Sequence, residues 1–486
     1  MKYLKNHILI LTAILCIVTI SCSSSNNLYD RGQFQVKHGE YEDAIRLYTK
    51  ALKKDPENPN ILTARGFAYT VVREFDKAVE DCNRAIKLKP DCNGAYINRG
   101  IAYAGKGEYD LALDDYNTYI GTYCVVPGAF INRGQVYNKT GNYDKAIEDF
   151  NQAIKLDSGN VLSYLHRGRA YNGKKEYDRA IADFKKTLDM TTMGPIQAEA
   201  YRGKGIVYYR LGKYDMAIEE FDRALKLVPR DADSHFHRGE SYAMKGEYAK
   251  SITDYSGFIK LKPDDYKGYF SRSNAYLKTG DFKKSALDYK KAYELNNKLD
   301  GSPGLDIDYV MGGKWDMLFQ LYNEYINIYP EAKEAYFNRG YASMRLQKYE
   351  DTIADMTRFM EINPDDMRSF MLRGPSYQSL GEYDKAIADY TTYLETSPED
   401  HIALVYRGVS YYSKGEYGKA LADFDEAIKY QPGYASAYLS KGETLEKMGE
   451  PEKALEAYKL YLEIGKDTAS PAGIKRAEER LKELTQ

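Results

Sequence analysis

The chain has 486 residues and carries 69 Lys or Arg against 71 Asp or Glu, which gives a formal net charge of −2 at pH 7. Neither sign forms a long run, so the sequence offers no basic surface for a polyanion and argues against a nucleic acid partner. A chain of this length would ordinarily predict about three globular domains, but a strong internal period replaces that expectation with one repeat array.

The N-terminal segment has the features of a targeting signal. Lys2 and Lys5 precede an uncharged apolar run over residues 8–20. This run is too short to span a bilayer comfortably, and its length suits the core of a signal peptide. Residues 1–22 are therefore predicted to be a signal peptide rather than part of the fold.

The end of this segment resembles a bacterial lipoprotein processing site. Residues 19–22 read Thr-Ile-Ser-Cys, and a polar run over residues 23–27 follows as a tether. The resemblance implies that Cys22 carries a lipid which anchors the protein in the cell envelope. Thr19 departs from the family pattern, which prefers a branched or long aliphatic residue there. Ser23 resembles the residue that sorts lipoproteins to the outer rather than the inner membrane. An ordinary secretory signal with a coincidental cysteine is the alternative.

A 34-residue pattern then recurs almost end to end, and it is clearest in residues 401–434. Its apolar positions have helical spacing on both sides of a glycine, which predicts two helices joined by a turn. Gly408 and Ala420 are small where the two antiparallel helices would cross, and Phe424 fills the flanking groove. With Pro432 near the end, this spacing resembles the tetratricopeptide repeat.

The resemblance implies an all-α fold, a right-handed superhelical solenoid of stacked antiparallel helix pairs. Thirteen repeats can be aligned on their eighth residue. Those residues are Gly32, Gly66, Gly100, Gly134, Gly168, Gly205, Gly239, Ser273, Gly340, Gly374, Gly408 and Gly442, with one irregular repeat after Ser273. Three extra residues before Gly205, within residues 191–197, are expected to lengthen a loop.

The predicted organisation has four parts after the signal peptide. Residues 23–298 hold repeats 1–8, residues 299–330 an irregular repeat 9, residues 331–465 repeats 10–13, and residues 466–486 a C-terminal capping helix. Such a cap protects the exposed end of a solenoid.

Repeat 9 interrupts the pattern. It has Gly301, Pro303 and Gly304 where a helix should begin and Leu318 at the small crossing position. Its first helix should therefore be short or distorted, whereas the sequence from Trp315 fits a second helix. A hinge and a merely degenerate repeat both remain open.

Most repeats carry opposite charges at their seventh and twenty-third positions. Both are lost together in repeat 9, where Leu305 and Leu321 stand. Joint loss is expected of a packed ion pair, because a single loss would leave a buried charge alone. We therefore predict a structural pair rather than an anion-binding row. The predicted pairs are Arg65–Asp81, Arg99–Asp115, Arg133–Asp149, Arg167–Asp183, Lys204–Glu220, Arg238–Asp254, Arg272–Asp288, Arg339–Asp355, Arg373–Asp389 and Arg407–Asp423.

No motif for catalysis or metal binding appears. Cys82, Cys92 and Cys124 lack the spacing of metal ligands. The sequence also has no glycine-rich phosphate loop and no nucleophile elbow. We therefore expect no enzyme, no metal and no cofactor. Cys92 and Cys124 lie near corresponding ends of adjacent repeats, but sequence spacing does not decide whether they form a disulfide.

In proteins that this array resembles, the first helices line a concave groove. Asparagines at the sixth position resemble the ladder by which some relatives hold an extended peptide backbone. Amides suit this task because each offers a donor and an acceptor to a main chain. The ladder is broken at several repeats, so we expect local binding. A solvated polar face is the alternative. The predicted partner-binding residues are Ile97, Asn98, Ile131, Asn132, Gln135, Asn138, His166 and Asn338.

Two functions from different classes follow. The first is a lipid-anchored, non-enzymatic envelope scaffold that binds partner polypeptides in the concave groove. The second is a receptor or carrier for a non-protein ligand such as a glycan, for which Tyr208, Tyr209, Tyr411 and Tyr412 would supply stacking platforms. Most tyrosines fall in packing positions, which favours the scaffold.

Overall fold

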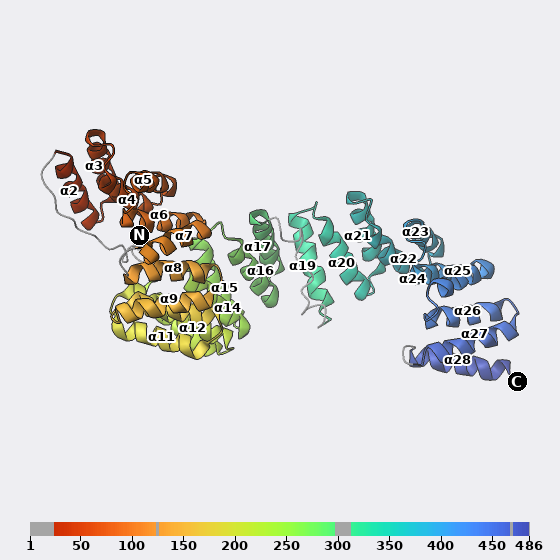
Figure 1. The fold of residues 1–486 in the computed structure, drawn as a ribbon. Coiled ribbons are helices and arrows are strands. Elements are labelled where there is room, and N and C mark those ends of the chain that lie inside the picture. Colours follow the sequence, from red (N-terminus) through yellow and green to blue (C-terminus); the bar gives the residue numbers. More distant parts are fainter. Residues whose placement is uncertain (1–23, 123–125, 297–312, 467–469, 486) are drawn as a thin grey trace. The chain divides into compact units, whose positions relative to one another are not determined.

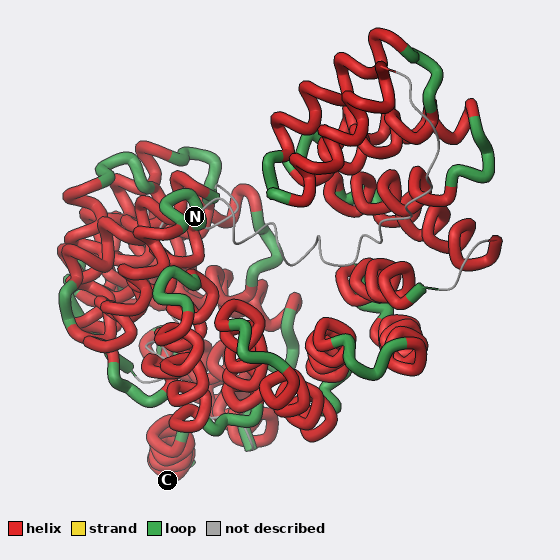
Figure 2. The backbone as a smooth tube through the Cα atoms, turned by 90° about the vertical axis from the view of Figure 1, so that its left-hand side faces the viewer, coloured by secondary structure: helices red, strands yellow, loops and turns green. Residues whose placement is uncertain are grey.

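The computed structural model describes residues 24–122, 126–296, 313–466 and 470–485. Within these residues the secondary structure is helical throughout, and no strand is present (Figure 2). The chain forms two compact units, Met1–Glu247 and Tyr248–Gln486, and each is described by itself. Their boundary lies inside repeat 7, not in repeat 9. The signal peptide and Cys22 lie outside the described residues.

The helices of the N-terminal unit follow one another as antiparallel pairs (Figure 1). They are α2 (Ser24–Lys37), α3 (Tyr41–Lys54), α4 (Pro59–Val71), α5 (Phe75–Leu88), α6 (Asn93–Lys106), α7 (Tyr109–Thr122), α8 (Pro127–Lys139), α9 (Tyr143–Leu156), α10 (Val161–Gly173), α11 (Tyr177–Met190), α12 (Gly194–Arg210), α13 (Tyr214–Leu227) and α14 (Ala232–Met244).

The C-terminal unit continues with the same kind of pair. Its helices are α15 (Tyr248–Leu261), α16 (Tyr266–Thr279), α17 (Phe282–Leu295), α19 (Trp315–Ile328), α20 (Lys333–Arg345), α21 (Tyr349–Ile362), the 3₁₀ turn η1 (Met367–Ser369), α22 (Phe370–Ser379), α23 (Tyr383–Thr396), α24 (His401–Ser413), α25 (Tyr417–Tyr430), α26 (Ala435–Lys447), α27 (Pro451–Ile464) and α28 (Pro471–Leu484). The stacked helix pairs confirm the predicted all-α repeat array.

Small residues set the spacing between the two helices of a repeat. A Cβ atom added to Gly134 on α8 would lie 2.8 Å from Cε1 of Phe150 on α9. Phe150 and Ala146 are both fully buried at this crossing. The glycine therefore lets the aromatic ring of the second helix lie directly on the backbone of the first.

The turn between the helices of a repeat uses a left-handed residue at its fifteenth position. Gly141 and Gly415 have φ values of +77° and +81° there. Arg73, Lys175 and Gln347 adopt the same conformation with φ values of 66°, 66° and 60°. A side chain in this region costs roughly 1–2 kcal/mol relative to ordinary backbone.

The predicted ion pairs are confirmed within each unit. On α8 Arg133 donates from Nε to Oδ2 of Asp149 at 2.9 Å and from Nη2 to Oδ1 at 2.6 Å. Its Nη1 also donates to Oδ1 of Asn117 on α7, in the preceding repeat, at 2.7 Å. Burial raises the pKa of Asp149, and the hydrogen bonds from Arg133 oppose that rise. Each such arginine thus joins three helices.

Equivalent ion pairs recur along the array, and one of them joins a lysine to a glutamate. They are Arg65–Asp81, Arg99–Asp115, Arg167–Asp183, Lys204–Glu220, Arg272–Asp288, Arg339–Asp355, Arg373–Asp389 and Arg407–Asp423. Arg238 and Asp254 belong to different units. Because these cations are engaged with carboxylates, they do not form an open anion-binding row.

Two local predictions need correction. The extra residues before Gly205 do not lengthen a loop, because α12 begins at Gly194 and is 17 residues long. Pro195 suits the first turn of a helix, where no backbone N–H is needed, so the insertion extends the helix instead. The polar residues 24–27, expected as a tether, form the first turn of α2.

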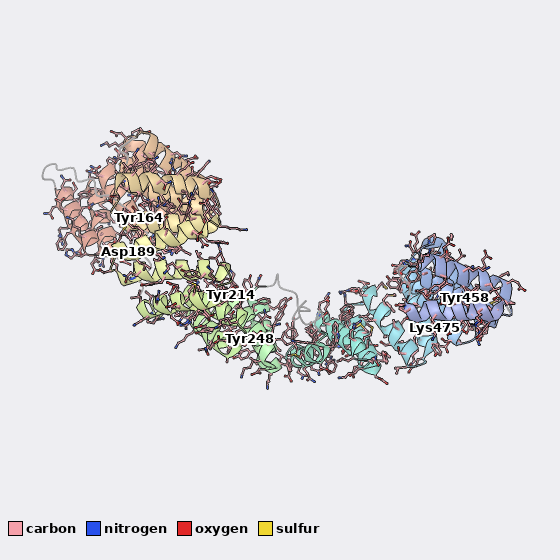
Figure 3. The ribbon with its side chains drawn as sticks, turned by 90° about the horizontal axis from the view of Figure 1, so that it is seen from below. Tyr164, Asp189, Tyr214, Tyr248, Tyr458 and Lys475 are labelled. Carbon is pink, nitrogen blue, oxygen red and sulfur yellow. The ribbon has the colours of Figure 1, made fainter. Side chains whose placement is uncertain are left out.

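The second half of repeat 9 and most of the C-terminal segment are helical. The second helix of repeat 9 is α19, in which Leu318 is fully buried at the crossing. The first helix of that repeat falls outside the described residues. The cap is α28, whose N-cap Ser470 accepts a hydrogen bond from the Gly473 N–H. Lys475 of α28 is exposed, whereas Tyr458 of α27 is buried (Figure 3).

Candidate functional site

The N-terminal unit contains a groove of about 550 Å³. It is lined by the C-terminal halves of the first helices of repeats 2–5, by the end of α12 in repeat 6, and by residues of the second helices α5, α7 and α9. A stack of helix pairs places these segments side by side, because successive repeats have the same fold and pack in the same orientation. The groove is therefore shared by five successive repeats.

Four of the predicted partner-binding residues line this groove together. Asn132, Gln135 and Asn138 come from α8, and His166 comes from α10. Asn132 is only 5% exposed, whereas Gln135 is half-buried. The Asn138 amide donates from Nδ2 to the carbonyl of His166 at 3.3 Å, so it also joins two repeats.

Other predicted site residues have different places. Ile131 is fully buried between α8 and α9, so its prediction as a groove residue is wrong: the fifth position faces the second helix. Ile97 is half-buried and packs with Tyr116 and Val136. Asn98 is 8% exposed and donates from Nδ2 to the Thr63 carbonyl at 3.2 Å. Asn338 is half-buried and belongs to the C-terminal unit.

His166 is a buried histidine rather than a surface ligand. It is 3% exposed, and its ring stacks on Phe150 with a centroid separation of 5.9 Å. Burial, with a smaller contribution from nearby Arg169, lowers the pKa of His166 to about 3. The imidazole is therefore neutral at physiological pH.

Aromatic rings form part of the groove wall. Phe67, Phe75, Tyr109, Tyr116 and Tyr143 all line it. Two glycines of the thirteenth position give these rings room: a Cβ atom on Gly105 would lie 2.5 Å from the ring of Phe75. Gly173 stands in the corresponding place against Tyr143. The rings supply flat apolar surface beside the amides of α8.

The charged residues that line the groove are all cationic. They are Arg73, Lys139, Arg169 and Arg210, and among the described residues no Asp or Glu shares the lining. Arg169 forms an ion pair with Glu199 on α12, and burial lowers the pKa of its guanidinium. The side chain of Arg210 donates from Nη1 to the Asn172 carbonyl at 3.0 Å and to Asn172 Oδ1 at 3.1 Å.

A second row of ion pairs contrasts with these cations. At the fourteenth position, Lys106 contacts Asp76 of the preceding repeat at 2.9 Å and Glu108 of its own repeat at 2.8 Å. Hydrogen bonds to these carboxylates raise the pKa of Lys106. Equivalent pairs surround Lys174, Lys245 and Lys414. The charges of these lysines are therefore balanced by neighbouring carboxylates.

Family models match most of the chain. Models described as TPR repeat match residues 28–70, 205–246 and 408–449. Models described as tetratricopeptide repeat match residues 68–123, 127–160, 161–191, 266–299, 333–366, 371–428 and 435–467. The chain belongs to the tetratricopeptide repeat family. No curated protein matches it significantly.

Several solved structures are similar to this tetratricopeptide repeat protein. A tetratricopeptide repeat protein from Parabacteroides merdae is 21% identical with a TM-score of 0.43, over 49% of this chain and 93% of that one. MamA is 30% identical with a TM-score of 0.31, over 34% and 95%. YrrB, described as a TPR protein with an unusual peptide-binding site, is 20% identical with a TM-score of 0.32, over 38% and 95%.

Tetratricopeptide repeats are protein–protein interaction modules, so this array is an interaction scaffold. In the part of the chain that the structure describes, no group of three or more His, Cys, Asp or Glu side chains is placed to hold a metal ion. Across the same residues, every helix is too short or too polar to cross a membrane.

Sequence reasoning missed the cations and the aromatic wall. The thirteenth positions of repeats 3–6 read Gly105, Lys139, Gly173 and Arg210, so small residues and long cations alternate along one edge. This alternation at the thirteenth position is the sequence feature from which the cations and the space for the rings could have been predicted. Tyr208, Tyr209, Tyr411 and Tyr412, expected as glycan platforms, do not line the groove, and Tyr208 is only 8% exposed.

Proposed function

We propose that this protein is a non-enzymatic scaffold, anchored to the bacterial envelope by a lipid on Cys22, that binds partner polypeptides in the groove of its N-terminal unit. The observation that carries the proposal is the joint lining of one groove by Asn132, Gln135 and Asn138 beside aromatic rings. Amides can hydrogen-bond a main chain of any sequence, and rings accept apolar side chains.

The anchor is supported by the sequence pattern around residues 19–22. The apolar run over residues 8–20 ends two residues before Cys22. Ser23, the residue after Cys22, favours sorting of the lipoprotein to the outer membrane. A tethered array would hold its groove close to the membrane surface, where partners of the envelope are available.

A glycan is the second candidate ligand, because Phe67, Phe75, Tyr109 and Tyr143 place aromatic surface in the same groove as the amides. Sugar rings stack on aromatic faces, and their hydroxyls bond to amides. A polypeptide is favoured because the lining combines the amides of α8 with apolar and aromatic side chains from five successive repeats, which an extended chain along the groove would contact in turn.

The test uses the chain from residue 23 onward in two parallel screens, a display library of random peptides and a glycan array. Peptides should be retained, and Gln135→Ala with Tyr109→Ala should release them. Glu148→Ala, an exposed change on α9 away from the groove, is the control. Binding to glycans without any peptide would overturn the proposal in favour of the second candidate.

A further inference from the structure

We propose that the open side of α2 in the first repeat lies along the membrane surface, with the side chain of Phe34 inserted among the lipid headgroups. The inference rests on the lipid anchor of the proposed function and adds a second contact between the protein and the bilayer. It concerns a surface other than the groove, whose lining residues begin at Phe67.

Phe34 occupies the tenth position of repeat 1, where the other regular repeats have a smaller, buried residue. Those residues are at most 3% exposed, whereas Phe34 is 57% exposed. They are Ala68, Ala102, Val136, Ala170, Val207, Ser241, Ala275, Ala342, Ser376, Ser410 and Thr444. The first repeat therefore departs from the others at this position in both the size and the exposure of the side chain.

The tenth position faces the preceding repeat. Val136 on α8 packs in one hydrophobic cluster with Ala112 and Tyr116 of α7. Ala170 and Ala342 belong to corresponding clusters with the second helix of the repeat before them. Within the described residues α2 has no such helix in front of it, so Phe34 lies on an uncovered side of the first repeat.

The C-terminal end of the array is built differently. It is covered by α28, and none of the large apolar side chains of that helix is exposed. Arg476 and Arg480 of α28 instead bond to Glu443 and Glu446 of α26. A polar outer face keeps the end of a solenoid soluble, so the exposed ring of Phe34 at the N-terminal end indicates a surface that is covered in the cell.

Charged and polar side chains surround Phe34 on the same side of α2. Asp30, Arg31, Lys37 and His38 lie three or four residues away from it, and all four are exposed. The Phe34 and His38 rings are in contact, with 4.1 Å between their centroids. A ring among charged groups is typical of helices that lie at the level of lipid headgroups, where cations contact phosphates.

The anchor is close enough to bring this side of α2 to a bilayer. Helix α2 begins at Ser24, two residues after Cys22. Two residues of chain span at most about 7 Å and ten residues of helix rise about 15 Å, so Phe34 lies within about 22 Å of Cys22. A lipid on Cys22 would therefore hold α2 at the membrane surface, where Phe34 meets headgroups at a high effective concentration.

A membrane fits this surface better than a second copy of the chain. Phe34 is the one exposed large apolar side chain of α2. A phenylalanine buries about 150–250 Å², whereas a stable dimer buries about 800 Å² of each partner. A bilayer needs no such area, because the lipid anchor already holds the protein there. A second copy is kept as an outcome of the test.

The test places a single tryptophan at position 34 of the lipid-anchored protein. Phe34→Trp is combined with Trp315→Phe, which removes the one natural tryptophan. The protein is reconstituted into vesicles of phosphatidylethanolamine and phosphatidylglycerol whose acyl chains carry bromine, a quencher of nearby tryptophan. Phe34→Trp should lose most of its fluorescence relative to vesicles without bromine. Met216→Trp in the same background, at an exposed residue of α13, is the matched control and should keep its fluorescence.

A second measurement leaves the whole chain unaltered. A water-soluble amine reagent should modify Lys37 several times more slowly in the vesicle-bound parent than in the soluble chain from residue 23 onward. Lys175, an exposed lysine of repeat 5, should react at the same rate in both. This comparison applies even if the tryptophan variants fold poorly.

The outcomes separate this inference from the anchor. Lipid-anchored protein with neither quenching of Phe34→Trp nor protection of Lys37 would overturn the inference and leave the anchor intact. Mass spectrometry that finds no lipid on Cys22 would overturn both. A shift of the Phe34→Trp emission as the soluble chain is concentrated, without vesicles, would assign the surface to a second copy and overturn the membrane contact.

Discussion

Arg133 and Asp149 form a bidentate ion pair that also reaches a third helix, through a hydrogen bond from Arg133 Nη1 to Asn117 Oδ1 at 2.7 Å. Asp149 is 4% exposed. The pair therefore fixes both the crossing of α8 on α9 and the contact of repeat 4 with repeat 3. A buried carboxylate without its partner is costly.

Arg133→Leu should lower the free energy of unfolding by about 1–3 kcal/mol, because Asp149 is left without a cation. Arg133→Leu with Asp149→Leu should recover much of that loss. Denaturant melts of the parent, both single variants and the double variant measure the coupling energy. A coupling energy of zero would show that the pair contributes nothing beyond its separate members.

Arg73→Gly should raise the free energy of unfolding by about 1 kcal/mol, because glycine accepts φ values near 66° without strain. Lys175→Gly and Gln347→Gly should behave alike, since both positions share the conformation. Thermal melts compare the three. An unchanged or lowered stability in all of them would mean that the left-handed turn holds no strain.

His166 should make stability depend on pH. Its pKa lies near 3 in the folded chain and near 6.5 in the unfolded one. Below about pH 6.5 the unfolded chain binds a proton that the folded chain excludes. The free energy of unfolding should therefore decrease as the pH is lowered from about 6.5, by up to about 1.4 kcal/mol per pH unit. The free energy of unfolding, measured by denaturant melts between about pH 7 and pH 5, should therefore change more with pH for the parent than for His166→Phe. An equal dependence of stability on pH in the two proteins would contradict this prediction.

Asn98→Ala and Gln135→Ala should separate folding from binding. Asn98 is 8% exposed and bonds to the Thr63 carbonyl, so its loss should destabilise the array by about 0.5–1.5 kcal/mol. Gln135 is half-buried in the groove, so its loss should change stability by less than about 0.5 kcal/mol while weakening partner binding. Denaturant melts and peptide titrations on both variants measure the two effects. Equal stability of the two variants would contradict this assignment.

Cys22→Ser should release the protein from the membrane, because the lipid would have no thiol to modify. Fractionation of cells expressing the parent and the variant, with detection of the chain by size, measures the result. The variant should appear as a soluble or unprocessed form. A variant of mature size that stays in the membrane fraction would rule out the lipid anchor.

The helix pairs and the buried ion pairs were predictable because their signals are periodic. Gly134 and Phe150, or Arg133 and Asp149, recur at the same places in most repeats, so many copies support one inference. The groove was predicted less well. Asn132, Gln135, Asn138 and His166 line one groove, and their binding of a partner stays a prediction. Ile131 is in the core instead, because helix spacing alone does not separate a groove position from a neighbouring core position.

The position of the cations that line the groove could not be derived from spacing. Lys139 and Lys174 are both lysines near the end of a first helix, at adjacent positions of the repeat. Only the structure shows that Lys174 meets Asp144 and Glu176, whereas Lys139 faces the groove. A shift of one residue along a helix turns a side chain by about 100°, which decides between these two environments.

The contact between repeats 3 and 4 recurs between repeats 4 and 5, and this has an evolutionary consequence. Arg133 bonds to Asn117, and Arg167 bonds to Asn151 in the same way at 2.6 Å. Removal of residues 127–160 by an in-frame deletion would bring Arg167 opposite Asn117 and Lys174 opposite Asp110, so no charge would lose its partner. Duplication of the same segment would create one more junction of the same kind. We therefore expect that a gain or loss of this repeat in a single event keeps the contacts between its neighbours, and that the groove can change in length by one repeat at a time.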